Sequence, residues 1–388
     1  MTSPQQTAQI KTWFGQRLPA MLTLLRRLVE AESPSHVPIA QQTVQARLAE
    51  ELVELDYRVR YLPGKETGGH LLARPQRSRR TCPYQLLLGH SDTVWPQGTL
   101  KNMPISDSGE RFSGPGSYDM KAGLVITLYA LRAIKELGLQ PPCSPVVFIN
   151  SDEEIGSPES TRPIRHLARH ARRALVMEPS LGPQGHLKTA RKGVGGFRVQ
   201  IEGKAAHAGL NPEAGASAIL ELAHQVRELF ALNDRELGVS VNVGRISGGM
   251  QANVIAPFAE AEIDVRVPNR DHAERVSAAI RELTPHTPGV SVHVSGAIRR
   301  PPLERTERNQ ALWLQAKALG RQLGIELNQA VAGGGSDGNT TSLYTATLDG
   351  LGAVGEGAHA ANEAIVPASL AERGALLTLL LIAPVEDT

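Results

Sequence analysis

The sequence has few of the residues that mark several common classes of binding protein. Only 4% of its 388 residues are aromatic, so platforms for stacking nucleic-acid bases are not expected. The 41 Lys and Arg residues nearly balance the 39 Asp and Glu residues, which leaves a formal net charge of +2. Proteins that bind DNA, RNA or anionic membranes usually carry a positive patch, and this balance gives no sign of one. We therefore expect a small-molecule partner.

Cysteines and long apolar runs are scarce as well. Cys82 and Cys143 are too few for a disulfide framework and lack the spacing of a zinc ribbon. No stretch approaches the ~18 consecutive apolar residues of a membrane span. The first residues also lack the basic and apolar regions of a signal peptide. Together these absences predict a soluble, cytoplasmic protein with reduced thiols.

Length and pattern predict two domains, because 388 residues exceed what one hydrophobic core usually supports. Short apolar runs alternate with helical patterns in the N-terminal part of the chain, and helices are predicted again at residues 309–324 and 367–381 in the C-terminal part. This favours an α/β fold with a mixed, largely parallel sheet flanked by helices. Between them the order becomes β-α-β-β-α-β, which is typical of a ferredoxin-like α+β insert. We expect a catalytic domain of residues 1–191 and 298–388, and an inserted dimerisation or lid domain of residues 192–297.

Three buried strands are predicted to end at ionisable side chains. The apolar runs are residues 85–89, 146–149 and 174–177. The groups that follow them are His90, the acidic run 152–154, and Glu178. Because the carboxyl ends of parallel strands meet at one edge of a sheet, these groups should converge. Converging carboxylates repel one another unless cations are present, so the sequence indicates a metal site.

Taken alone, each candidate ligand has a simpler explanation. His90 resembles a structural histidine, Asp119 could cap a helix, and His359 lies in a glycine-rich loop. The turn before Asp119 matches neither phosphate-binding glycine fingerprint. Two histidines and three carboxylates nevertheless form a mixed ligand set that suits Zn²⁺ and tolerates Co²⁺ or Mn²⁺. A shared carboxylate would hold two ions roughly 3.5–4 Å apart.

At this point the sequence resembles a known family. It is similar to the zinc-dependent exopeptidases and amidohydrolases that include glutamate carboxypeptidase, acetylornithine deacetylase, succinyl-diaminopimelate desuccinylase and aminoacylase. The bacterial glutamate carboxypeptidase branch is the most similar. The matching segments, in the family's order, are residues 89–94, 114–121, 152–157, 177–179, 203–209, 333–337 and 357–359. One departure is Ala122, where the family usually has glycine; alanine favours a helix, so little damage is expected.

The resemblance implies a metal-binding role for five residues. His90 and Glu178 would bind one zinc ion, and Glu154 and His359 would bind the other. Asp119 would bridge the two ions. Each subunit would therefore hold two Zn²⁺ ions as cofactors.

The resemblance also implies roles for residues that do not bind metal. Glu153 corresponds to the general base, and Asp92 would orient the imidazole of His90. His207 resembles a histidine that stabilises the oxyanion in the site of the partner subunit, which implies a homodimer formed through the inserted domain. The residues that match substrate-contacting positions are Asn253, Arg266 and Arg300.

The function implied by this resemblance is a metallo-carboxypeptidase that removes a C-terminal, glutamate-like amino acid from a small peptide or N-acyl conjugate. The alternatives are an N-acyl-amino-acid deacylase and a non-catalytic relative that binds metal or amino-acid conjugates. Three basic residues, Lys188, Arg191 and Lys192, either favour an acidic substrate portion or form a solvated face. No nucleic-acid or membrane partner is expected.

Overall fold

The computed structural model describes residues 3–77 and 82–385. It divides into two compact units, which we call unit 1 and unit 2. Unit 1 consists of Met1–Ala190, Arg305–Ala332 and Ser336–Thr388, and unit 2 of Arg191–Glu304 and Gly333–Gly335. Unit 2 extends beyond residue 297, the expected end of the inserted domain, because its last strand continues to Arg300. A dimerisation or lid role for unit 2 stays a prediction.

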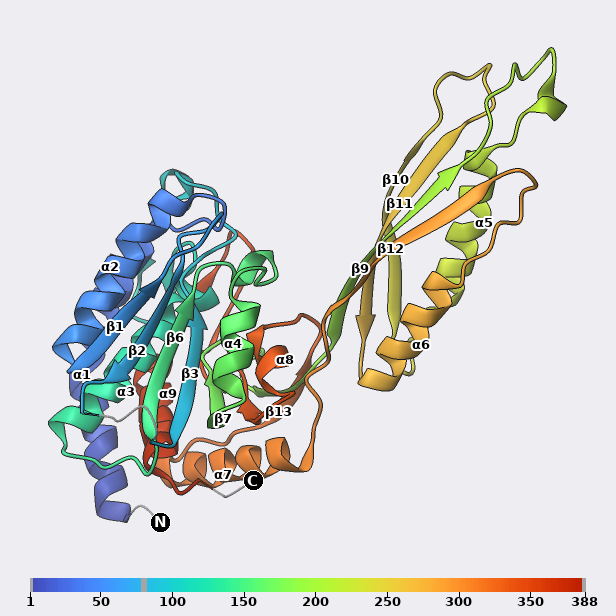
Figure 1. The fold of residues 1–388 in the computed structure, drawn as a ribbon. Coiled ribbons are helices and arrows are strands. Elements are labelled where there is room, and N and C mark those ends of the chain that lie inside the picture. The colour runs from blue at the N-terminus through green and yellow to red at the C-terminus, as the bar shows by residue number, and fades with distance from the viewer. Residues whose placement is uncertain (1–2, 78–81, 386–388) are drawn as a thin grey trace. The chain divides into compact units, whose positions relative to one another are not determined.

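Unit 1 is built on a six-stranded sheet (Figure 1). In spatial order its strands are β1 (Tyr57–Leu62), β2 (His70–Pro75), β6 (Ser144–Asn150), β3 (Tyr84–His90), β7 (Ala171–Val176) and β14 (Ala346–Leu348). The last four pair in parallel, whereas β1 pairs with β2, and β2 with β6, in antiparallel fashion. The predicted mixed, largely parallel sheet is thereby confirmed.

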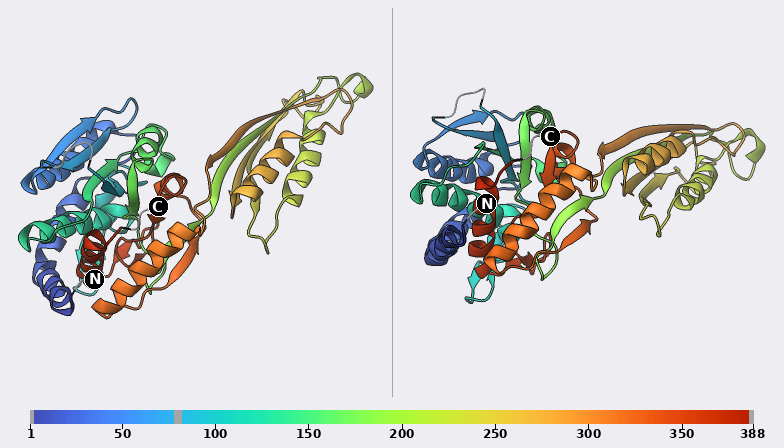
Figure 2. Two further views of the ribbon diagram at one scale, coloured as in Figure 1. Left: turned by 60° about the horizontal axis from the view of Figure 1, so that its bottom comes forward. Right: turned by 90° about the horizontal axis from the view of Figure 1, so that it is seen from below.

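Helices cover both faces of this sheet. They are α1 (Pro4–Glu30), α2 (Pro38–Glu54), α3 (Ala122–Glu136), α4 (Thr161–Ala168), α7 (Glu307–Leu323), α8 (Asp337–Thr341) and α9 (Ala368–Ile382). Leu87 packs in the large core that includes α1, α3 and α9, helices that lie close together in Figure 2. Leu86 and Leu88 point to the opposite face and pack in a core that includes Ile164 of α4. Burial on both faces explains why β3 is continuously apolar.

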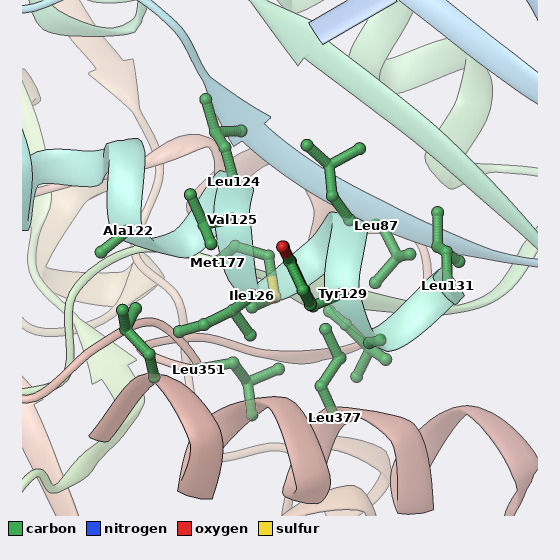
Figure 3. Packing of buried hydrophobic residues seen from close by; sticks show 14 of the residues in the cluster. Leu87, Ala122, Leu124, Val125, Ile126, Tyr129, Leu131, Met177, Leu351 and Leu377 are labelled. Carbon is green, nitrogen blue, oxygen red and sulfur yellow. The ribbon is translucent and has the colours of Figure 1, made fainter. Parts of the chain in front are cut away.

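Helix α3 connects this core to the sheet edge where the candidate ligands lie. Its side chains, together with Leu87 of β3 and Leu377 of α9, fill the interior shown in Figure 3. A side chain at Gly123 would overlap the backbone carbonyl oxygen of Met177, so this position requires glycine. Ala122, the first residue of α3, is fully buried and fits without such a conflict. The helix can therefore lie directly against the segment that leads to Glu178.

Two smaller sheets complete unit 1. Their strands are β15 (Gly355–Glu356), β16 (Ala364–Ile365), β5 (Phe112–Ser113) and β4 (Ser106–Asp107) in one, and β13 (Gln329–Ala332) and β8 (Leu187–Arg191) in the other. In the first, β16 pairs with β5, so segments about 250 residues apart in the sequence lie side by side. Among the described residues, no helix has the length and apolar character needed to cross a membrane.

Unit 2 is a four-stranded antiparallel sheet with two helices (Figure 1). In spatial order the strands are β10 (Ser240–Gly248), β11 (Phe258–Val267), β9 (Gly193–Glu202) and β12 (Ser291–Arg300). Along the chain, α5 (Ala218–Ala231) follows β9, and α6 (Arg270–Arg281) follows β11. This order confirms the ferredoxin-like arrangement. Alternate residues of β9 and β11 pack against the helices in a separate core.

Candidate metal centre

Three of the candidate ligands follow neighbouring parallel strands. His90 ends β3 and is 1% exposed, Glu154 lies in the short turn Glu153–Ile155 after β6, and Glu178 lies two residues beyond β7. Since β6, β3 and β7 are adjacent and parallel, their carboxyl ends bring these side chains to one edge of the sheet. His90 Nε2 is 3.4 Å from Glu178 Oε1.

The other two candidate ligands come from loops next to the small sheet that contains β5 and β16. Asp119 lies in the irregular turn Ser117–Lys121 that precedes α3, and His359 lies between β15 and β16 with φ 62°. Asp119 Oδ1 is 3.3 Å from His90 Nε2, and its Oδ2 is 3.4 Å from His359 Nε2. One carboxylate therefore faces both imidazoles, with one oxygen directed to each.

Glu154 completes the cluster, because its Oε2 is 3.1 Å from His359 Nε2. The five side chains thus form two halves that share Asp119: His90 with Glu178, and His359 with Glu154. Glu153 lies on the Glu178 side, where its carboxylate can come within 4.8 Å of the ligand atoms of His90 and Glu178. The structure therefore brings together all five predicted ligands and the predicted general base.

These residues fit a divalent cation. Within the described part of the chain, three buried atoms at the centre have no hydrogen-bond partner: His90 Nε2, Asp119 Oδ1 and Glu154 Oε1. Leaving a buried polar atom unsatisfied costs about 1–3 kcal/mol, and more when it is charged. Carboxylates also outnumber imidazoles here, so cations would relieve their mutual repulsion. Imidazole nitrogen and carboxylate oxygen are the donors that zinc accepts.

The crowded charges shift several pKa values. Hydrogen bonds to Asp119 and then Glu154 raise the pKa of His359 to about 10. Burial raises the pKa of Glu154 to about 7, although its hydrogen bond with His359 opposes the shift. Burial alone would raise the pKa of Asp119, but the nearby imidazoles of His359 and His90 hold it well below the usual range. A ligating imidazole must be neutral, so metal binding at His359 would displace a proton.

Asp92 lies beside His90 and is fully buried. His90 Nδ1 is 3.0 Å from the Asp92 carbonyl oxygen and 3.4 Å from its carboxylate. The same carboxylate accepts hydrogen bonds from Ser35 Oγ at 2.7 Å and from the backbone N–H groups of Glu153 and Glu154 at 3.3 and 3.2 Å. Asp92 therefore contacts His90 and also holds the turn that carries both glutamates. The second contact leaves no sequence signal, since backbone amides occur at every residue except proline.

His207 lies in unit 2, in an exposed turn after β9. Its Nδ1 accepts hydrogen bonds from the backbone N–H groups of Gly209 and Leu210, at 3.1 and 3.2 Å. Because Nδ1 accepts, a neutral His207 carries its proton on Nε2. The turn therefore presents the imidazole as a hydrogen-bond donor.

The predicted substrate residues also lie in unit 2. Asn253 is exposed, Arg266 on β11 forms an ion pair with Asp264 at 2.8 Å, and Arg300 is 9% exposed at the end of β12. They lie in three different elements. Their contact with substrate stays a prediction.

The basic stretch after Glu178 is not a solvated face. Lys188 and Arg191 are buried, so that interpretation is wrong for both. Arg191 donates hydrogen bonds to the carbonyl oxygens of Gly334 and Gly335, at 3.1 and 3.4 Å. Lys188 Nζ lies 3.9 Å from Glu178 Oε2, which places a cation beside the candidate centre. Lys188 was named from the sequence among three basic residues but could not be placed beside Glu178, because the strand β8 that carries it was not predicted.

Imidazoles and carboxylates gathered around a central carboxylate at a sheet edge are typical of metal-dependent hydrolases. The comparison with family models agrees: residues 86–383 match the model of peptidase family M20/M25/M40. The chain belongs to this family and is a hydrolase.

Individual proteins resemble the chain in sequence or in fold. The chain is 29% identical to carboxypeptidase G2 of Pseudomonas sp. (strain RS-16) over 304 residues, which cover 76% of this chain and 72% of the relative. The fold resembles aminopeptidase PepT from Bacillus cereus, with a TM-score of 0.76, 22% identity, and coverage of 94% and 98% of the two chains. It also resembles the Bacillus subtilis YXEP protein, described as a dinuclear metal-binding peptidase of the M20 family, with a TM-score of 0.68, 15% identity, and coverage of 96% and 98%.

Proposed function

We propose that this enzyme is a two-metal carboxypeptidase that hydrolyses an amide bond next to a free carboxylate and releases a C-terminal, glutamate-like amino acid. The observation that carries this proposal is Asp119, whose two oxygens face His90 and His359, at 3.3 and 3.4 Å. A carboxylate shared in this way suits a pair of ions. Zn²⁺ is the proposed metal, with Co²⁺ or Mn²⁺ as substitutes.

In the proposed mechanism, His90, Asp119, Glu154, Glu178 and His359 would hold two ions, which would supply a water of lowered pKa and a polarised scissile carbonyl. Glu153 is the general base, because it lies beside the ligand cluster but is not needed to complete either half of it. It removes a proton from the attacking water and delivers it to the leaving nitrogen. Asp92 orients the imidazole of His90 and stabilises the turn that carries Glu153 through a hydrogen bond from its backbone N–H. The Nε2–H of His207 supplies the hydrogen bond that stabilises the oxyanion.

One observation supports an acidic substrate, and another supports release of a C-terminal residue. Lys188 is 7% exposed and lies close to the carboxylate of Glu178. Its ammonium provides a positive charge that can attract a substrate carboxylate near the scissile bond. The relative at 29% identity is named a carboxypeptidase, which favours release of a C-terminal residue over removal of an N-acyl group.

Hydrolysis assays test the proposal. The protein, loaded with Zn²⁺ or Co²⁺, is offered peptides and N-acyl amino acids with varied C-terminal residues, and the products are identified. We expect release of a C-terminal acidic amino acid, loss of activity with a chelator, and recovery with Zn²⁺. Cleavage of acetyl-amino acids in preference to peptides would favour the deacylase. Metal binding without any hydrolysis would favour the non-catalytic relative.

We also propose a homodimer formed through unit 2, in which His207 acts in the site of the partner subunit. β10 is an edge strand of its sheet, and apolar side chains are exposed on it and nearby. They are Ile219, Leu220, Ile246, Met250 and Phe258. An exposed apolar patch of this kind is typical of a protein interface. Light scattering should give the mass of a dimer for the wild type and of a monomer for Ile246→Glu.

A further inference from the structure

One buried carboxylate outside the ligand set accepts four hydrogen bonds. Glu363 is fully buried. Its Oε1 accepts from the backbone N–H groups of Tyr118 and Asp119, at 2.8 and 3.0 Å. Its Oε2 accepts from the backbone N–H of Gly116 at 2.8 Å and from the indole N–H of Trp95 at 2.7 Å. Burial raises the pKa of Glu363, and these four donors oppose the rise by favouring the ionised carboxylate, to which hydrogen bonds are roughly twice as strong as to a neutral acceptor.

Three of these donors belong to the turn that presents Asp119, and one of them is the N–H of Asp119 itself. The backbone of the same glutamate adds a further link, because the N–H of Gly114 donates to the Glu363 carbonyl oxygen at 3.3 Å. The turn around Asp119 has non-helical φ and ψ angles, so the hydrogen bonds of a regular helix do not stabilise it. Glu363 supplies the acceptors that a helix would otherwise provide.

Glu363 also belongs to the loop that carries His359. Only three residues separate them, and the N–H of Glu363 donates to the carbonyl oxygen of Ala360 at 2.9 Å. A single side chain therefore joins the loop of one ligand to the turn of another. The distance that this arrangement fixes is the 3.4 Å between Asp119 Oδ2 and His359 Nε2.

We propose that Glu363 is a positioning residue that sets the carboxylate of Asp119 against the imidazole of His359 before any metal binds. The inference rests on the proposed two-metal site. It assigns no contact between Glu363 and substrate or metal. Residues that orient metal ligands typically change metal affinity or activity by 10–100-fold when replaced.

The test is metal binding by Glu363→Gln, because an amide nitrogen cannot accept the two hydrogen bonds that one carboxylate oxygen now accepts. Metal-free protein is titrated with Co²⁺ and followed by visible absorption, which reports ligand geometry without any turnover. We expect 10–100-fold weaker binding of at least one ion and an altered spectrum, with an unchanged circular dichroism spectrum. Wild-type affinity together with a wild-type spectrum would overturn the proposal.

Glu32→Gln is the matched control. Glu32 is a partly buried carboxylate that likewise accepts backbone N–H groups, from Gly98 at 2.7 Å and Leu100 at 2.9 Å. The loop it holds carries none of the proposed ligands. We expect its variant to lower the melting temperature somewhat and to leave Co²⁺ affinity unchanged. Equal weakening of Co²⁺ binding in both variants would mean that Glu363 stabilises the fold in general, which contradicts the proposal.

Hydrogen exchange on the metal-free wild type covers the case in which Glu363→Gln does not fold. The amides of Tyr118 and Asp119 should be protected before metal is added; exchange at the rate of an exposed loop would overturn the proposal.

The same measurements distinguish a failure of the positioning role from a failure of the proposed function. Wild-type protein that binds two Co²⁺ ions but cleaves no peptide contradicts the proposed function and leaves the positioning role intact. Wild-type protein that binds no ion contradicts both.

Discussion

The candidate metal centre in unit 1 and the candidate substrate residues in unit 2 are built in opposite ways. In unit 1, four of the five proposed ligands are largely buried, and carboxylates such as Asp92 hold the loops that carry them. In unit 2, His207 and Asn253 are exposed and lie in turns. The fold of unit 1 thus brings the five proposed ligands together without any residue of unit 2. Unit 2 presents separate, exposed side chains, to which the proposed function assigns a role at the site.

This difference predicts how substitutions in the two units will behave. A change in the metal centre alters buried hydrogen bonds, so it should affect metal affinity or stability together with activity. A change at an exposed turn of unit 2 should affect activity alone, since surface substitutions usually alter stability by less than about 0.5 kcal/mol. The predictions below test this contrast, from the largest expected effect to the smallest.

Glu153→Ala should have the largest effect on activity and is the exception within unit 1. As the proposed general base, Glu153 contributes a factor of about 10²–10⁴ to turnover. Because it is not a proposed ligand, the variant should retain both metal ions and its melting temperature. Steady-state kinetics and metal analysis measure these quantities. Glu51→Ala, which removes an ion pair between Glu51 of α2 and Arg132 of α3, serves as the control. Full activity in Glu153→Ala would rule out the assignment.

His207→Ala should reduce kcat by about 10²–10³, the effect of removing one oxyanion donor. Metal content and melting temperature should not change, because the side chain is exposed. His293→Ala, at another exposed histidine of unit 2, should leave kcat unchanged. A wild-type kcat for His207→Ala would contradict the proposed contrast between the units, because His207 of unit 2 would then supply no catalytic group.

Asp92→Asn should weaken zinc affinity and activity together, by about 10–100-fold. An amide offers only one acceptor oxygen where the carboxylate accepts hydrogen bonds from Ser35, Glu153 and Glu154. Competition with a fluorescent chelator measures the affinity. Ser35→Ala removes only the hydroxyl donor and should have a smaller effect. Loss of activity at unchanged zinc affinity would show that Asp92 does not orient His90.

The smallest effect concerns the stability of the metal-free protein. The pKa of His359 is raised from 6.5 to about 10, so its charged form is favoured in the folded state. Its contribution to stability is then complete below pH 6.5 and is lost as the pH rises through about 10. The melting temperature of the wild type relative to His359→Gln should therefore fall over this range. A difference that stays constant or grows with pH would contradict the assigned ion pairs.

Much of the candidate metal centre could be predicted from the sequence, because three of its five proposed ligands follow apolar strands. β3 and β6 are continuously buried, so their apolar runs and their ends are visible in the sequence. The edge strand β1 has a mixed pattern with several exposed residues, and it was not predicted. The role of Glu363 could not be inferred either. Its partners are mostly backbone amides, and these leave no trace in residue types.

The most direct test of the two-metal centre is a crystal structure of the zinc-loaded protein with anomalous data collected at the zinc edge. Two peaks should lie on either side of the Asp119 carboxylate. One should contact His90 and Glu178, and the other Glu154 and His359. A single peak at full zinc occupancy, or peaks away from Asp119, would contradict the proposal that this carboxylate is the bridge on which the site is built.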